Sequence, residues 1–125
     1  MIYGIGVDIA ETVRVERLLA DYGERFARRI LTDQELGEFE RRDRSHRYLA
    51  SRFAAKEAVA KALGTGIGKH LSFRSVQVEN DARGKPSLRF IGDARQTIER
   101  LRITNAMVSL SDEKNYVVAM VVLET

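Results

Sequence analysis

Residues 52–67 carry the sequence RFAAKEAVAKALGTGI, which is typical of a helix that runs into a glycine-rich turn. Glu57 and Lys61 are four residues apart, so both side chains project from one face of that helix. The ordinary interpretation is an intrahelical ion pair worth about 0.5 kcal/mol. The alternative is that a carboxylate and an ammonium act together on a bound ligand.

Further phosphate-binding groups surround this pair in the sequence. They are two cations and the open backbone of the turn, at Arg52, Lys56, Gly64, Thr65 and Gly66. The turn is not a Walker loop, because it follows a helix instead of opening one and no Gly-Lys-Ser/Thr comes after it. Such a turn is more often a helix stop than a phosphate cradle. A carboxylate beside these groups nevertheless matches what metal-assisted phosphoryl chemistry needs.

A second carboxylate, Asp8, lies at the end of a predicted strand. Gly4 and Gly6 precede it and would let another backbone or a ligand come close. Carboxylates at strand ends are often only helix caps or loop formers. Together, however, Asp8 and Glu57 would suit Mg²⁺, which usually takes one or two carboxylates and completes its shell with water and substrate phosphate.

The composition is that of an ordinary globular protein. The chain has 125 residues, enough for one domain over 1–125 with a modest core, and 44% of them are hydrophobic. No apolar run approaches the roughly 18 residues of a membrane span, and the N-terminus lacks the features of a signal peptide. Since there is no cysteine, disulfides, thiolate metal sites and thiol nucleophiles are excluded. We expect a cytoplasmic protein without a membrane partner.

The net charge is only +3, but arginines recur between residues 14 and 52. Acidic residues are interspersed, so one interpretation is a solvated surface with many ion pairs. The other is a basic face for an acidic partner, either a protein or a nucleic acid. Nucleic acid is the weaker candidate, because the segment has few aromatic residues to stack on bases and no groove-reading motif.

Hydrophobic periodicity and turn residues predict a mixture of helices and strands. The predicted elements are a strand over 2–9, a helix capped by Thr12, a helix through Phe39 opened by the capping box Thr32-x-x-Glu35, a helix from Ser45 to Leu63 ended by Gly64, strands over 73–79 and 87–90, a helix over 93–101, and strands over 107–111 and 116–123. Two hairpins imply mainly antiparallel pairing, so the fold class is α+β. The last strand is almost continuously apolar, which fits burial on both faces or a subunit interface.

Several segments together resemble the holo-[acyl-carrier-protein] synthase family, the small bacterial 4′-phosphopantetheinyl transferases. The resembling segments are GIGVDI at 4–9 with Arg14, RFAAKEA at 52–58 with Lys61-Ala62 and GTGI at 64–67, GKP at 84–86, and VSLSDE at 108–113. The resemblance runs from one end of the chain to the other, and residues 52–67 are its most specific part. It implies the 4′-phosphopantetheinyl transferase fold.

The resemblance also implies an activity. Such enzymes move the phosphopantetheine arm of coenzyme A onto a serine of apo-acyl carrier protein in fatty acid biosynthesis and release adenosine 3′,5′-bisphosphate. By resemblance, Asp8 and Glu57 hold Mg²⁺ against the coenzyme A pyrophosphate. Glu57 is then the candidate acceptor of the serine proton, and Lys61 stabilises the pyrophosphate or the leaving bisphosphate. The residues implied for binding coenzyme A are Arg52, Lys61, Gly64, Thr65 and Gly66.

Two protein partners are implied as well. The acidic carrier protein is expected to face the arginines of the first predicted helix, which are Arg14 first, then Arg17, Arg25 and Arg28. Small members of the family are homotrimers with active sites between subunits, which fits the short chain and the apolar last strand. On this basis Asp8 would act with Glu57 of the partner subunit.

One departure from the family pattern concerns Met107, which stands where many relatives have a histidine. Methionine cannot donate a hydrogen bond to a phosphate or shuttle a proton. Because Asp8, Glu57 and Lys61 are all present, we interpret the change as the loss of an auxiliary contact.

Two other classes of function remain open. A non-catalytic adaptor would bind a carrier protein through the arginines but would have no use for Asp8 and Glu57 together. A nucleic-acid-binding module is suggested only by the pI of about 9.4.

Overall fold

The computed structural model describes residues 1–125. Its elements are, in chain order, β1 (Ile2–Glu11), α1 (Thr12–Tyr22), α2 (Glu24–Ile30), α3 (Asp33–Arg41), α4 (His46–Leu63), a 3₁₀ turn (Phe73–Ser75), β2 (Val76–Asn80), β3 (Pro86–Phe90), α5 (Gly92–Arg100), β4 (Asn105–Asp112) and β5 (Tyr116–Glu124). All strand pairs are antiparallel. The predicted α+β class is therefore confirmed.

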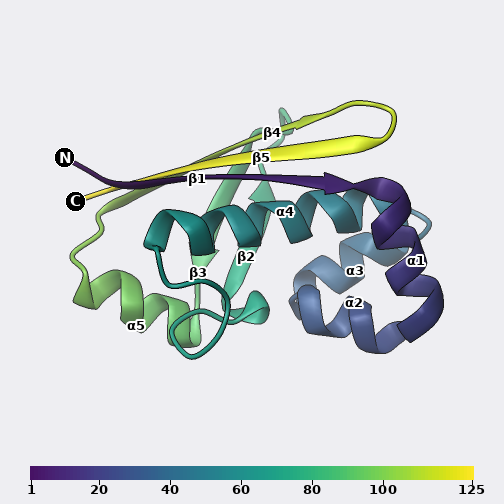
Figure 1. Ribbon diagram of the computed structural model, residues 1–125, viewed down its shortest axis with the longest axis horizontal. Coiled ribbons are helices and arrows are strands. Elements are labelled where there is room, and N and C mark those ends of the chain that lie inside the picture. Colours follow the sequence, from purple (N-terminus) through teal and green to yellow (C-terminus); the bar gives the residue numbers. More distant parts are fainter.

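The strands form two sheets. The larger has the order β1-β5-β4, and the smaller is the hairpin of β2 and β3. Both predicted hairpins, β2–β3 and β4–β5, are confirmed. Because the first strand pairs with the last, the two chain ends lie together (Figure 1), and the Met1 ammonium donates a hydrogen bond of 3.2 Å to the Thr125 carbonyl.

Helix α4 runs lengthwise along one face of the larger sheet, with α1, α2 and α3 grouped at one end of it and α5 at the other (Figure 1). This packing is unusually close at β1. A Cβ atom on Gly6 would lie 2.0 Å from the carbonyl oxygen of Ala58, and one on Gly4 would lie 2.0 Å from that of Ala62. The glycines therefore admit the backbone of α4, not a ligand, and this contact fixes how Asp8 faces the helix.

Three of the predicted helix ends are confirmed. Thr32 and Glu35 form both bonds of the capping box, and Ser45 accepts a hydrogen bond from the Tyr48 amide at the start of α4. Gly64 ends α4 with a φ of +80°, a conformation that favours glycine. Local sequence patterns thus place the start and the end of the helix that carries Glu57.

Other local predictions are wrong. Thr12 is the first residue of α1 and not its cap, and its amide donates to the Asn115 carbonyl in the β4–β5 turn. The N-terminal helical region is broken at Gly23 into α1 and α2. Residues 73–75 form a 3₁₀ turn, so the strand that follows begins only at Val76.

The last strand, β5, is apolar on both faces but is covered on only one. Its buried residues alternate along the strand: Val117, Ala119, Val121 and Leu123. The opposite side carries exposed apolar residues of all three strands, here called the outer apolar face: Ile5, Val7, Ile9, Met107, Val118 and Met120. Burial of β5 on both faces is therefore not present within one chain. No helix has the combined length and apolarity needed to cross a membrane.

Candidate active site

Asp8 of β1 and Glu57 of α4 line one pocket of about 240 Å³, here called the carboxylate pocket. Arg14, Leu18 and Phe53 also line it. The two carboxylates belong to the same chain, so the expectation that Asp8 would act with Glu57 of the partner subunit is wrong. The reason is the close packing of β1 on α4, which brings the end of the strand to the middle of the helix.

Lys61 pairs with Asp8. Its Nζ lies 3.0 Å from Asp8 Oδ1 and 3.0 Å from the carbonyl oxygen of Val7. The intrahelical ion pair between Glu57 and Lys61, the ordinary interpretation of their spacing, is not formed. The carboxylate of Glu57 consequently has no hydrogen-bond partner within the protein, and it stays free for a ligand.

The electrostatics of Glu57 match a cation site. Partial burial raises the pKa of Glu57, and the nearby Asp8 carboxylate raises it further, while Lys61 and Arg14 oppose the shift. A hard dication between the two carboxylates would relieve this repulsion. No group of three or more metal-ligating side chains exists, so water and substrate oxygens would have to complete the shell, as is usual for Mg²⁺. The donor set therefore fits Mg²⁺.

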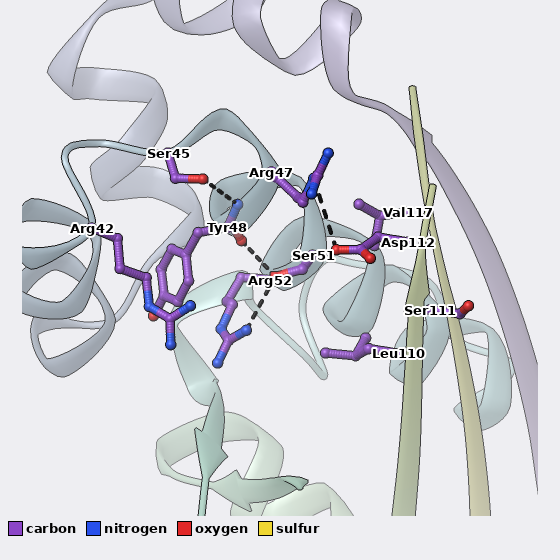
Figure 2. A pocket seen from close by; sticks show the side chains of 10 residues that line it. All are labelled: Arg42, Ser45, Arg47, Tyr48, Ser51, Arg52, Leu110, Ser111, Asp112 and Val117. Atoms are coloured by element: carbon purple, nitrogen blue, oxygen red, sulfur yellow. Dashed lines mark hydrogen bonds and ion pairs between the residues drawn. The ribbon is translucent and has the colours of Figure 1, made fainter. Parts of the chain in front are cut away.

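Arg52 does not join these residues. It is 5% exposed, its guanidinium stacks 4.3 Å from the centroid of the Tyr48 ring, and it donates hydrogen bonds to Ser51 and Asn80. Its Nε has no partner. Figure 2 shows it beside a second pocket of about 410 Å³, also lined by Arg42 and here called the arginine pocket.

The arginine pocket is a distinct cationic site. Arg47 reaches toward Asp112 from the opposite wall, at 3.8 Å, and Ser111 lies nearby on β4 (Figure 2). None of the residues that line this pocket also lines the carboxylate pocket. Arg52 and Glu57 therefore line different pockets of one chain, which their closeness in sequence does not reveal.

Lys56 is likewise no phosphate ligand. Its side chain is fully buried and donates to the carbonyl of Ile30 and to Glu35. The partner, Glu35, lies on another helix, so the sequence predicted only its part in the capping box. The sequence led us to predict Lys56 as a phosphate-binding residue. Helix α4 is buried on nearly all sides, so the hydrophobic pattern of its sequence does not show which side chains face solvent.

The glycine-rich turn mainly ends the helix. The amides of Gly64 and Gly66 both donate to the carbonyl of Ala60, and the Thr65 hydroxyl donates to the Gly66 carbonyl. These two glycine amides are therefore already used. The turn remains exposed and follows Lys61 by less than one helical turn, so it lies at the same end of α4 as that ammonium.

The basic residues divide into two groups. Arg14 lines the carboxylate pocket, and Arg25 lines a larger apolar groove of about 640 Å³. Arg17 and Arg28 are exposed but line neither. The apolar groove is lined by Leu18, Tyr22, Arg25, Phe26, Arg29, Ile30, Phe53, Glu57 and Phe73. Sequence reasoning did not assign its aromatic residues or Arg29 to a site, because the aromatic residues are few and lie far apart along the chain.

Comparison with known proteins places these features in one family. A model of the 4′-phosphopantetheinyl transferase superfamily matches residues 4–121. The chain is 51% identical over 124 residues to the holo-[acyl-carrier-protein] synthase of Vibrio cholerae serotype O1, an alignment that covers 99% of this chain and 98% of that relative.

Solved structures agree with this match. The holo-[acyl-carrier-protein] synthase of Neisseria meningitidis has a TM-score of 0.95 and 46% identity, with both chains covered completely. That of Bacillus anthracis, solved in complex with coenzyme A (3′,5′-ADP), has a TM-score of 0.84 and 42% identity, covering 100% of this chain and 98% of that one. The similarity thus extends over sequence and fold alike.

Proposed function

This chain belongs to the 4′-phosphopantetheinyl transferase superfamily, and we propose that it transfers the 4′-phosphopantetheine group of coenzyme A to a serine of apo-acyl carrier protein in a Mg²⁺-dependent reaction. The full-length match to holo-[acyl-carrier-protein] synthases confirms the resemblance drawn from the motifs and makes the chain an enzyme. The observation that carries the proposal is the meeting of Asp8 and Glu57 beside Lys61. We assign the reaction to fatty acid biosynthesis in the cytoplasm.

Asp8 and Glu57 are the proposed ligands of Mg²⁺. Bound there, the ion would neutralise charge on the pyrophosphate oxygens of coenzyme A, which lowers the barrier to phosphoryl transfer. The free carboxylate of Glu57 and its repulsion with Asp8 support this assignment. Lys61 is within reach of the same place, since it already contacts Asp8, and its ammonium would bind the pyrophosphate or the departing nucleotide as a point charge.

The proposed chemistry is an in-line displacement. The serine oxygen of the carrier protein attacks the phosphorus that bears pantetheine and forms a new O–P bond. The bond from that phosphorus to the oxygen bridging the two phosphates breaks, and adenosine 3′,5′-bisphosphate leaves with the electron pair. Glu57, directly or through a water, accepts the proton of the serine hydroxyl.

The arginine pocket is the proposed place for the nucleotide end of coenzyme A. Arg42, Arg47 and Arg52 supply the guanidinium groups that suit phosphate. Because this pocket is separate from the carboxylate pocket, we propose that one coenzyme A spans two subunits. Its pyrophosphate would lie at Asp8 and Glu57 and its nucleotide at Arg52 of the partner subunit.

A homotrimer is the proposed assembly. The outer apolar face spans all three strands of the larger sheet, and its central cross-strand pair, Val7 and Met120, is 52% and 44% exposed. Exposed apolar patches of this kind mark interaction sites. Closing this face against further copies would bury it and would bring the two pockets of neighbouring subunits together.

The acidic carrier protein is proposed to dock along α1 and α2. Arg14 and Arg25 reach the two cavities that contain Glu57, and the apolar groove offers a place for an apolar side chain of the carrier. Arg17 and Arg28 are exposed on the same helices and would add charge attraction at the rim.

Mass spectrometry of apo-acyl carrier protein tests the proposal. After incubation with this protein, coenzyme A and Mg²⁺, the carrier should gain the mass of one phosphopantetheine group, and a chelator should prevent the gain. Glu57→Gln should abolish the gain while carrier binding persists. The matched control is Glu99→Gln on the remote helix α5, which should transfer normally.

Other results would favour the alternatives. Binding of the carrier without any transfer by the wild-type protein would support the adaptor. Tight binding to duplex or single-stranded nucleic acid at physiological salt would support the third candidate. Undiminished transfer by Glu57→Gln would refute the assigned role of Glu57.

A further inference from the structure

One ion pair lies inside the protein where the functional helices meet. Lys56 is 0% exposed and Glu35 is 2% exposed. The Lys56 ammonium lies 2.5 Å from the carbonyl oxygen of Ile30 and 2.5 Å from Glu35 Oε1. Glu35 in turn accepts hydrogen bonds from the amides of Thr32 and Val78, at 2.9 and 2.8 Å. The end of α2, the start of α3, strand β2 and helix α4 are therefore joined at a single point.

Such a pair is a poor source of stability. Burial of both charges carries a large desolvation cost, and apolar residues of similar volume often serve a fold equally well. Desolvation lowers the pKa of Lys56 to about 8, although the adjacent Glu35 carboxylate acts in the opposite direction. What the pair provides is geometry, since its four hydrogen bonds have fixed directions and fully buried partners.

The geometry that it fixes is that of the apolar groove. One wall of this groove is α2, with Arg25, Phe26 and Ile30, and the other wall includes Phe53 and Glu57 of α4. Lys56 directly precedes Glu57 in α4 and bonds to the last residue of α2. It makes the only hydrogen bond between these two helices.

We propose that Lys56 and Glu35 are positioning residues that set the separation between the α2 wall and Glu57, and thereby the width of the groove that receives the carrier protein. The inference rests on the proposed function, because it assumes that the carrier docks along α1 and α2. Neither side chain lines the carboxylate pocket or the arginine pocket. Glu35 lines a third cavity of about 340 Å³, which it shares with Arg42 and Arg52. Replacement of the pair should therefore change the binding of the carrier protein and not the binding of coenzyme A or of the metal.

The test is a charge-neutral replacement of the whole pair, Lys56→Met with Glu35→Gln. Methionine matches the length of the lysine stem, and glutamine keeps one acceptor oxygen for the Thr32 or Val78 amide, so no buried charge is left alone. We expect the KM for apo-acyl carrier protein to rise by about tenfold, a coupling of the size usual for residues that act through others. The KM for coenzyme A and the Mn²⁺ affinity without substrate should stay unchanged, and kcat should change by less than about threefold.

A matched control removes an exposed pair from the same segment. Asp33→Asn breaks the contact with Arg74 at the start of α3, where Asp33 is 94% exposed, and it should leave every kinetic constant unchanged. If the double variant does not fold, Lys56→Gln with Glu35→Gln is measured in the same way, because this pair is also neutral and one amide group can donate to the other.

Each outcome decides the inference. An unchanged KM for the carrier would overturn it, and so would an equal loss of coenzyme A affinity, metal affinity and kcat, which is what a purely structural role predicts. Failure of the proposed function itself looks different, because the wild-type protein would then transfer nothing and no KM for the carrier could be measured.

Discussion

Lys61 of α4 donates a hydrogen bond to Asp8 of β1, with 3.0 Å between Nζ and Oδ1, and leaves Glu57 on its own helix unpaired. The ammonium thus stands where a metal ion bound by Asp8 would have to approach. In the proposed reaction the same ammonium serves the pyrophosphate, so it must leave Asp8 when metal and substrate enter. On this proposal, Asp8 would pair with the Lys61 ammonium in the free protein and with the metal ion in the complex.

This exchange predicts a gain of metal affinity when the ammonium is removed. Lys61→Met should bind Mn²⁺ in the absence of coenzyme A about two- to fivefold more tightly, which corresponds to the loss of one solvent-accessible ion pair. Transfer should fall at the same time, since the pyrophosphate loses its cation. Electron paramagnetic resonance titration measures the affinity. Lys69→Met, at an exposed lysine without an ion pair, is the control, and weaker Mn²⁺ binding by Lys61→Met would contradict the exchange.

Because the pKa of Glu57 is raised, we expect its ionised carboxylate to lower the folding stability of the metal-free protein at neutral pH, although the proposed reaction needs that carboxylate. Burial first and Asp8 second raise this pKa, so the folded protein binds the proton more tightly than the unfolded one. The resulting stabilisation is present at low pH and is lost as the pH rises through the folded pKa. Glu57→Gln should therefore melt at a higher temperature than the wild type at pH 7 without metal, and the difference should shrink toward pH 4.

Thermal melts with and without Mg²⁺ measure this effect. Mg²⁺ should raise the melting temperature of the wild type, because it binds only the folded state, and should not raise that of Glu57→Gln. The control Glu113→Gln, at an exposed glutamate, should behave as the wild type. A metal-free Glu57→Gln variant that melts below the wild type at pH 7 would argue against repulsion between Asp8 and Glu57.

Because β1 packs closely on α4, we expect the geometry of the carboxylate pocket to depend on Gly6. A Cβ atom there would meet backbone atoms of Ala58 and Ala62, at 2.0 and 2.7 Å, so the strand must move away from the helix. Gly6→Ala should cost about 3 kcal/mol of unfolding free energy, the upper end of the usual cost of overpacking. It should also weaken metal binding, because Asp8 moves with the strand.

Denaturant unfolding measures the cost, and Gly37 supplies the control. Gly37 lies inside α3, where the nearest atom to an added Cβ is the end of a flexible arginine at 3.7 Å. Gly37→Ala should stabilise the protein by about 1 kcal/mol through helix propensity. Equal effects of the two substitutions would show that β1 and α4 are not held together by this contact.

What the sequence could and could not predict follows from these contacts. The capping box at Thr32, the end of α4 at Gly64 and both hairpins depend on residues that are neighbours in the chain, so local patterns were sufficient. The burial of Lys56 depends on Glu35 of another helix, and the sequence of α4 has no polar stripe that separates its covered sides from its open one. The glycines before Asp8 signalled a close approach but could not say whether a helix or a ligand makes it.

If the outer apolar face is the subunit interface, one charged substitution at its centre should prevent assembly. Met120 lies at its centre, opposite Val7 on β1. Met120→Lys should turn the proposed trimer into a monomer, because a desolvated ammonium at the interface has no partner, and transfer should be lost with it. Light scattering measures the mass. Gln96→Lys, which adds the same charge on α5, should remain assembled, and a monomeric wild type would contradict the proposed trimer.

A substitution at Met107 tests whether the proposed reaction needs a histidine as an acid or base at this position. It is 46% exposed on β4 and faces outward beside Val122. The resemblance to the family led us to expect a histidine at this position. If that histidine were an essential acid or base, Met107→His should raise kcat by about 10²- to 10⁴-fold, the usual contribution of such a group. We expect a change of less than about tenfold, because in the proposed mechanism Asp8 and Glu57 would hold the metal, Glu57 would accept the proton and Lys61 would bind the phosphate. Steady-state transfer assays decide between the two, with Met107→Gln as the control for a polar side chain that cannot shuttle a proton. A gain of several orders of magnitude that is specific to histidine would mean that Glu57 is not the principal proton acceptor.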